Sequence, residues 1–242
     1  MSDNQITSAQ NPKVKFLLQL QQKSSERRKS GLFIIEGRGE LLHCIEAGYE
    51  VDTVFFCGTL NPEGGSHPEG FELRVDRQTH IIRGCRTFEV SKEVYEKVAY
   101  RGNTEGVIAE VRTRNLTLHD LKQSQNPLIV VLESVEKPGN LGAILRSADA
   151  AGVDAVIVCD PLTDLYNPNL IPSSLGGIFT VPCVACSSDR LSPPPVDSLV
   201  LLATYGIVHL GGLKCLPLTL VVPGSSLYSA TLWIFGELCL LL

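Results

Sequence analysis

The chain has 242 residues, of which 44% are hydrophobic and 19% charged, and its formal net charge is −5. This composition is typical of a globular protein with a sizeable core and excludes an intrinsically disordered chain. The length allows one large or two ordinary domains. Residues 1–5 lack the apolar stretch of a secretory signal peptide, so we expect a cytoplasmic protein whose eight cysteines are reduced thiols.

The negative net charge looks wrong for a nucleic-acid-binding protein, but the charges are unevenly distributed. Nineteen of the 21 Lys and Arg residues precede position 147, whereas residues 151–242 hold two bases against six acids. Residues 11–30 hold six bases and one acid, Glu26. Such a basic segment can bind phosphates by counterion release, although a solvated helix face would have the same composition.

In the first half of the chain, strand-like and helix-like segments alternate, which predicts a small α/β sandwich. Ser91 is expected to be an N-cap, and the polar residues 112–126 to be a linker. The expected elements are a helix over 11–30, a strand over 32–37, a helix over 38–47 that ends at Gly48, a strand over 51–57, a loop over 58–70, a strand followed by a helix within 71–98, and a strand over 107–111.

The second half begins with a strand over 128–133 and continues into a Gly/Asn turn and a helix that carries Arg146. Gly139 and Gly142 allow a tight turn or a close approach of the backbone to a partner, and Asn140 is of a favoured N-cap type. Such a turn and helix can hold an anion or a ribose. A dinucleotide-binding fingerprint would need Gly-x-Gly-x-x-Gly, which is absent here.

This segment resembles the first motif of the SpoU family of RNA ribose 2'-O-methyltransferases, which belongs to the SPOUT superfamily. The family pattern fixes the spacing of seven residues, and this chain has each of them: Pro138, Asn140, Gly142, Ile144, Arg146, Ala148 and Gly152. A Rossmann-type turn or an ordinary helix start remains the alternative. Residues 31–111 likewise resemble the substrate-binding domain that precedes many SpoU catalytic domains.

Residues 166–182 resemble the second family motif, in which Ser-x-Gly starts a helix and a strand then leads into a proline. Four positions fit that pattern, namely Ser174, Gly176, Phe179 and Pro182. Pro172 stands where the family usually has Arg, and this removes a cation expected to assist RNA binding or helix packing.

The third family motif is only partly recognisable. Residues 231–235 resemble its strand, and Gly236 and Glu237 resemble the start of its donor-binding loop, but the Ile-Pro-Met and Ser-Leu-Asn elements do not follow. We therefore hypothesise a frameshift or a truncated reading frame. The uncharged stretch 215–236 is long enough to consider a membrane helix, but its prolines and glycine favour strands of an incomplete core.

The resemblance implies an α/β protein with an N-terminal RNA-binding sandwich and a C-terminal trefoil-knot methyltransferase domain whose knot is incomplete. The implied domains are 1–111 for RNA substrate binding, 112–126 as linker and 127–242 for methyl transfer. The implied reaction moves a methyl group from S-adenosylmethionine to a ribose 2'-hydroxyl of rRNA or tRNA. The alternative is a catalytically inactive RNA-binding remnant without a complete donor site.

The resemblance also assigns residues and partners. Arg146 would hold the ribose and its phosphate or activate the 2'-hydroxyl, and Asn140 would orient Arg146 or the ribose. Gly236 and Glu237 would bind the donor. RNA is the expected partner, the chain is expected to be a homodimer by family, and no membrane is expected. No metal is expected either, since Cys183 and Cys186 form a lone CxxC. Glu36 is either an RNA contact or a partner of Arg38 or solvent. The expected RNA-binding residues are Lys13, Arg27, Arg28, Arg38 and Ser174.

Overall fold

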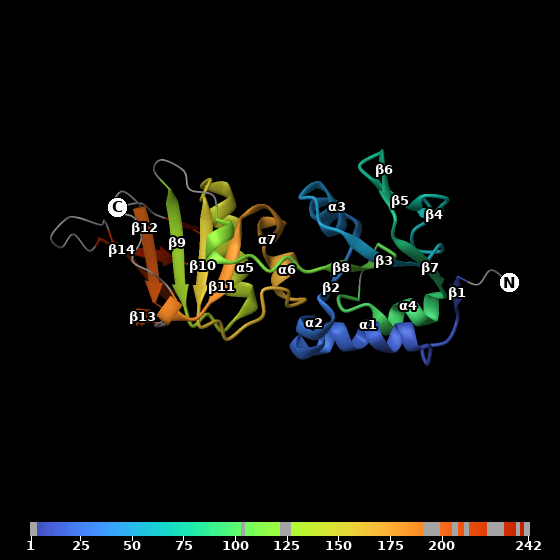
Figure 1. Cartoon of the computed structure of the whole chain (residues 1–242), viewed down its shortest axis with the longest axis horizontal. Coiled ribbons are helices and arrows are strands. Elements are labelled where there is room, and N and C mark those ends of the chain that lie inside the picture. The colour runs from blue at the N-terminus through green and yellow to red at the C-terminus, as the bar shows by residue number, and fades with distance from the viewer. Residues whose placement is uncertain are drawn as a thin grey trace. The chain divides into compact units, whose positions relative to one another are not determined.

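The computed structural model describes residues 4–102, 105–121 and 127–190, together with the strand segments 199–204, 208–210, 213–221, 230–235 and 238–239. The chain forms two compact units (Figure 1). The first consists of Met1–Arg114 and Tyr166–Pro172, and the second of Asn115–Leu165 and Ser173–Leu242. Both units combine helices with strands, so the expected α/β class is confirmed.

The first unit is built on a five-stranded sheet with the strand order β1-β7-β3-β8-β2, beside a three-stranded antiparallel sheet β4-β5-β6. Strand β8 runs antiparallel to both of its neighbours, whereas β7 is parallel to β1 and β3. The elements are β1 (Gln5–Ile6), α1 (Pro12–Gln22), α2 (Ser24–Ser30), β2 (Leu32–Glu36), α3 (Arg38–Glu46), β3 (Val51–Phe56), β4 (Gly65–His67), β5 (Gly70–Val75), β6 (Gln78–Arg83), β7 (Arg86–Val90), α4 (Lys92–Val98) and β8 (Val107–Arg112).

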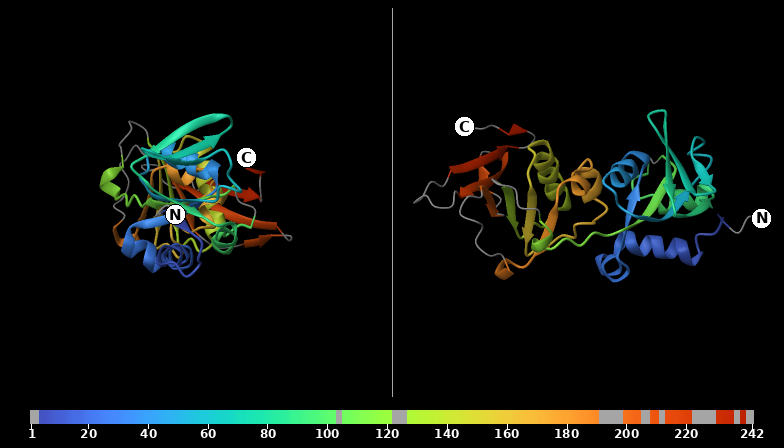
Figure 2. Two further views of the ribbon diagram at one scale, coloured as in Figure 1. Left: turned by 90° about the vertical axis from the view of Figure 1, so that its right-hand side faces the viewer. Right: turned by 45° about the horizontal axis from the view of Figure 1, so that its top comes forward.

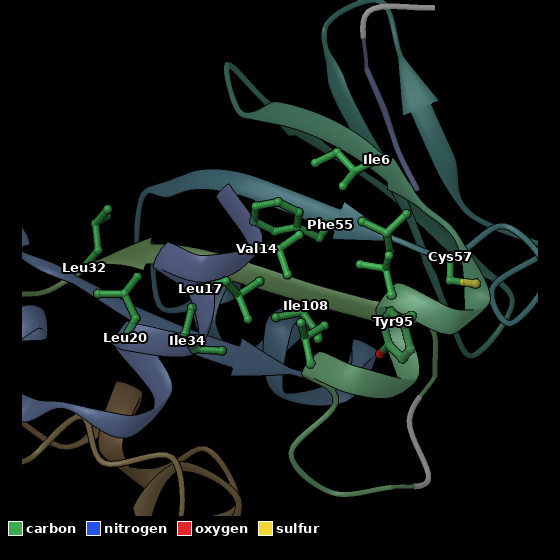
Figure 3. Close-up of a cluster of buried hydrophobic side chains, with 13 residues drawn as sticks. Ile6, Val14, Leu17, Leu20, Leu32, Ile34, Phe55, Cys57, Tyr95 and Ile108 are labelled. Carbon is green, nitrogen blue, oxygen red and sulfur yellow. The ribbon is translucent and has the colours of Figure 1, made fainter. Parts of the chain in front are cut away.

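Helices α1 and α4 cover one face of the five-stranded sheet, and α3 covers the other (Figures 1 and 2). Figure 3 shows Leu17 of α1 and Tyr95 of α4 packed around Phe55 and Ile108 of the sheet, and all four are at most 1% exposed. Side chains of a strand alternate between its faces, so the neighbouring residues of β2 and β3 form the core beneath α3. The sheet is therefore buried on both faces.

The helix predicted over 11–30 is wrong in one respect, because the chain breaks at Lys23, whose backbone is extended (φ −121°, ψ 113°). Arg27 accounts for the break. Its guanidinium is buried and donates hydrogen bonds to the carbonyls of Leu20 (2.6 Å) and Gln21 (3.2 Å) at the end of α1. A side chain from α2 thus satisfies carbonyls that a continuous helix would have bonded through its backbone.

The strand content of residues 58–90 was underestimated. The predicted loop contains β4, and the single strand expected before the Ser91 helix is three strands, β5, β6 and β7. The turn between β5 and β6 is Asp76–Arg77, which lacks the glycine that usually marks such a hairpin. The Ser91 N-cap is confirmed, since its hydroxyl accepts a hydrogen bond from the backbone N–H of Val94 at 3.3 Å.

The second unit contains a sheet with the order β11-β10-β9-β12-β14-β15-β16, in which β13 also pairs with β14. Strands β11, β10, β9 and β12 are parallel, and the pairs from β12 to β16 are antiparallel. The elements are the 3-10 helix Leu118–Asp120, β9 (Leu128–Glu133), α5 (Pro138–Ala150), β10 (Ala155–Cys159), α7 (Gly177–Thr180), β11 (Cys183–Cys186), the 3-10 helix Ser188–Arg190, β12 (Leu199–Thr204), β13 (Val208–Leu210), β14 (Leu213–Val221), β15 (Ala230–Phe235) and β16 (Leu238–Cys239). The short helix α6 (Leu170–Ser173) precedes α7.

The uncharged stretch 215–236 is strand wherever the structure describes it, in β14 and β15. Among the described residues, no helix combines the length and the apolar character that a bilayer crossing requires. Gly236, Glu237 and residues 240–242 lie outside the described residues. The expected incomplete knot is therefore not tested.

Candidate functional site

The first motif occupies α5, which follows the parallel strand β9 through Ser134, a residue in the left-handed backbone region (φ 53°). Helix α5 begins at Pro138 after Lys137, which supplies no side-chain cap. Asn140 is therefore the third residue of the helix, and its predicted role as N-cap is wrong. Proline fixes φ near the helical value and lacks the N–H that a first helical residue leaves unbonded, so Pro138 sets the start instead.

The glycines of the two motifs allow α5 to pack very closely on the α6–α7 segment. A β-carbon on Gly142 would lie 2.8 Å from the Cβ of Ser173, and one on Gly177 would lie 2.8 Å from the carbonyl oxygen of Leu145. A β-carbon on Gly139 would meet nothing within 4 Å. The close approach predicted for Gly142 is thus to the protein itself, and Gly139 has no such constraint.

The second motif differs in structure from its prediction. Ser174 is 1% exposed, and the chain then turns through Leu175 (φ 48°) and Gly176 (φ 93°) into α7. The helix expected at Ser-x-Gly is α7, but the strand expected to lead into Pro182 is wrong, since β11 begins only after that proline. The local sequence gives α7 little support, but the hydrogen bond from Thr180 Oγ1 to Asp149 on α5 (2.6 Å) holds it in place.

Arg146 is exposed on α5 and forms neither a hydrogen bond nor an ion pair with any described residue. Asn140 is half-buried near the start of the same helix. The structure thus places both predicted catalytic residues on one helix, as expected, without a contact between them. An unpaired guanidinium on a rigidly packed helix is suited to an anionic or oxygen-rich ligand.

The predicted RNA-binding bases of the first unit fall into different environments. Lys13 and Arg28 are exposed, and the Lys13 ammonium lies 4.9 Å from the centre of the Phe88 ring. Arg27 is 4% exposed and serves the backbone of α1. Arg38 is half-buried, 3.7 Å from the carboxylate of Glu105. Arg27 therefore leaves the candidate set, and the charge of Arg38 is partly neutralised.

Glu36 pairs neither with Arg38 nor with solvent. Its carboxylate accepts hydrogen bonds from the backbone N–H groups of Tyr100 (2.7 Å) and Arg101 (3.2 Å), and its side chain is buried. The Arg101 guanidinium in turn donates to the Glu36 carbonyl at 2.9 Å and to Glu40 at 2.7 Å. Glu36 therefore fixes the loop after α4.

The remaining bases of residues 11–30 have little acidic compensation. All of them are exposed, and Glu26 is the one acid within these two helices. The prediction named Lys13 and Arg28 of them, and the same run of bases includes the others. We call this set the α1–α2 basic surface, and it consists of Lys13, Lys15, Lys23, Arg28 and Lys29.

A buried carboxylate lies beneath α1. Glu110 on β8 is 4% exposed, and its Oε1 has no hydrogen-bond partner among the described atoms. Burial is the main cause that raises the pKa of Glu110 to about 7, and the charge of Asp52 acts in the same direction. The Thr53 hydroxyl and the charges of Arg86 and Lys13 act in the opposite direction. Asp52 itself is ion-paired to Arg86.

The residues predicted to hold the methyl donor, Gly236 and Glu237, lie outside the described residues, and no described residue of the second unit can be assigned to it in their place. Cys183 and Cys186 are three residues apart on β11 and so point to opposite faces of the strand. In the part of the chain that the structure describes, no three His, Cys, Asp or Glu side chains form a metal-binding group.

Comparison with known proteins agrees with this arrangement. Residues 11–109 match the MRM3-like substrate binding domain, and residues 127–191 match the SpoU rRNA Methylase family. An uncharacterised tRNA/rRNA methyltransferase of Synechocystis sp. is 33% identical over 73% of this chain, which spans only 60% of that protein.

Two solved structures share the fold. The crystal structure of an RNA 2'-O ribose methyltransferase is 35% identical, with a TM-score of 0.60 over 77% of this chain and 67% of that one. An AdoMet-bound rRNA methyltransferase from Sinorhizobium meliloti is 24% identical, with a TM-score of 0.63 over 76% of this chain and 65% of that one, and at this identity the likeness concerns the fold alone.

Proposed function

The chain belongs to the SpoU rRNA methylase family, and on that premise we propose that it transfers a methyl group from S-adenosylmethionine to a ribose 2'-hydroxyl of rRNA. The observation that carries the proposal is Arg146 on α5, which is exposed, has no partner among the described residues and stands at the position where the family motif has its arginine. tRNA is the alternative substrate. The donor, when bound, supplies a methyl group on a sulfonium, which is a good leaving group.

Arg146 would act on the ribose. The guanidinium remains charged at every accessible pH, so it serves as an electrostatic group and not as a base. In this role it stabilises negative charge that develops on the 2'-oxygen as the hydroxyl proton passes to solvent water, and it holds the neighbouring phosphate. Asn140 orients the ribose from the first turn of α5. The close packing of α5 on α7 supports this proposal, because a site on a rigid element is held more accurately than one on a loop.

The first unit would hold the RNA. The α1–α2 basic surface offers five exposed cations, which bind phosphates and release counterions, so we expect the affinity to fall steeply with salt. Arg38 contributes weakly because Glu105 lies beside it. Ser174 is buried, and we expect it to support the α6–α7 turn more than to contact RNA.

Other features of the proposal follow from the family. The domains would be 1–111, 112–126 and 127–242. The boundary between the compact units after Arg114 supports this division, although Tyr166–Pro172 belongs to the first unit. Gly236 and Glu237 would hold the donor. The working protein would be a cytoplasmic homodimer.

Isothermal titration of the purified chain with S-adenosylmethionine, and with S-adenosylhomocysteine for comparison, tests the proposal. We expect binding at micromolar strength. A folded chain that binds RNA but neither ligand would instead be an inactive RNA-binding remnant, and the proposed activity would be wrong.

A further inference from the structure

Strands β5 and β6 form a two-stranded ribbon that projects from the first unit (Figures 1 and 2). Val75 pairs with Gln78, so only two residues form the turn between them. The base of the ribbon is anchored, because Phe71 and Leu73 are fully buried. The ribbon therefore holds its tip in a defined position on a fixed base.

The turn at the tip is strained. Asp76 (φ 49°) and Arg77 (φ 66°) both occupy the left-handed region, which is the conformation of a type I′ turn. The second position of this turn strongly favours glycine, since a side chain there meets the backbone. Glycine at position 77 would fit the backbone conformation of this turn better than arginine does. The presence of an arginine there therefore needs an explanation other than the turn.

Contacts within the protein do not supply that reason. The Arg77 side chain is exposed and forms no hydrogen bond or ion pair with the residues that the structure describes, its neighbour Asp76 included. Arg74 donates from Nε to the neutral Thr79 hydroxyl at 3.3 Å and has no carboxylate partner among those residues. Arg83 differs, since it is paired with Glu69 at 2.7 Å.

We propose that the tip of the β5–β6 ribbon binds the RNA phosphate backbone through Arg77 and Arg74, as a contact additional to the α1–α2 basic surface. A guanidinium presents parallel N–H donors that match the geometry of a phosphate. Strain in the backbone is typical of a residue kept for binding. This inference rests on the proposed function, because it takes RNA as the substrate.

The test compares Arg77→Gly, Arg74→Gln and the control Arg83→Gln, which loses the same charge from the same ribbon. Binding to a fluorescein-labelled rRNA stem-loop is measured between about 50 and 200 mM KCl. We expect Arg77→Gly and Arg74→Gln each to bind about fivefold more weakly, with a salt slope smaller by about one. We expect Arg83→Gln to stay within about twofold. Arg77→Gly should also raise the melting temperature by about 2–4 °C, because it removes strain.

Three outcomes would overturn the inference. Arg77→Gly could bind the stem-loop as the wild type does, or Arg83→Gln could lose as much affinity as Arg77→Gly, so that only total charge matters. Polyglutamate serves as an acidic-polypeptide probe. If Arg77→Gly lost polyglutamate binding while its RNA binding stayed unchanged, the tip would be assigned to a protein partner. If the wild type itself shows no salt-dependent RNA binding, the proposed function fails together with this inference. The wild-type measurement therefore distinguishes failure of the proposed function from failure of the inference about the tip alone.

Discussion

A β-carbon on Gly142 would lie 2.8 Å from the Cβ and 2.9 Å from the carbonyl carbon of Ser173. Both distances are well below the contact distance of about 3.5–4.0 Å between carbon atoms. The glycine of the first motif is therefore required by the packing of α5 against the second motif. The close approaches of Gly142 to Ser173 and of Gly177 to Leu145 hold the helix that carries Arg146.

Gly142→Ala should destabilise the second unit. Alanine favours a helix by about 1 kcal/mol over glycine, but overpacking against the Ser173 backbone costs about 1–3 kcal/mol, so we expect a net loss of roughly 1 kcal/mol. Gly139→Ala is the control on the same helix, and it should be neutral or slightly stabilising, because nothing lies within 4 Å of its β-carbon. Urea unfolding measures both, and equal effects of the two substitutions would refute this account.

Arg27 and Arg28 are neighbours in sequence with different expected roles. Arg27→Gln should lower the free energy of unfolding by about 1–3 kcal/mol, since it leaves buried carbonyls of α1 without their donor. Arg28→Gln should change stability by less than about 0.5 kcal/mol and should weaken RNA binding, with a salt slope smaller by about one. Unfolding and RNA titration of both variants check the pair, and the opposite pattern would show that Arg27 reaches the RNA.

Glu110 should make stability depend on pH near neutrality. Its folded pKa is raised from 4.5 to about 7, so the folded state keeps a proton that the unfolded state releases. Stability is therefore highest below the unfolded value and falls by about 3 kcal/mol as the pH rises through about 7. The groups around it are Thr53, Asp52, Arg86 and Lys13.

Glu110→Gln should remove this dependence and be the more stable protein at about pH 8. Glu50→Gln, which removes an exposed carboxylate paired with Arg112, is the control and should keep the wild-type slope. Denaturant unfolding from about pH 5 to 8 provides the curves. Parallel curves for wild type and Glu110→Gln would mean that the buried carboxylate does not titrate in this range.

Arg146→Ala should abolish most methyl transfer without affecting the fold. The side chain is exposed and unpaired among the described residues, so we expect stability to change by less than about 0.5 kcal/mol. The loss of a charge that stabilises the developing oxyanion predicts a kcat lower by about 10²–10³-fold. Lys137→Ala, at the N-cap of the same helix, is the control for a lost positive charge. A similar loss in both variants would show that Arg146 has no specific role.

Much of the fold follows from local sequence. Apolar strands and the Ser91 cap were predicted because each depends on residues close in the chain. Asn140 was misread as a cap because Pro138, two residues earlier, is the stronger start signal. The β5–β6 hairpin was missed because Arg77 occupies the position where glycine would announce the turn.

The site was predictable only in outline. The motif spacing placed Asn140 and Arg146 on one helix, but the partner of Gly142 depends on tertiary packing. The burial of Arg27 was not predicted for the same reason, because its sequence context is that of its exposed neighbour Arg28. Only the turn between α1 and α2 makes one of them structural.

The most direct test of the account is methyl transfer from tritium-labelled S-adenosylmethionine to rRNA, followed by alkaline hydrolysis. A 2'-O-methyl group blocks cleavage of the adjacent phosphodiester, so the account predicts label in alkali-stable dinucleotides and its loss in Arg146→Ala. No transfer from a chain that is folded and binds RNA, or label recovered only in alkali-labile mononucleotides, would contradict it.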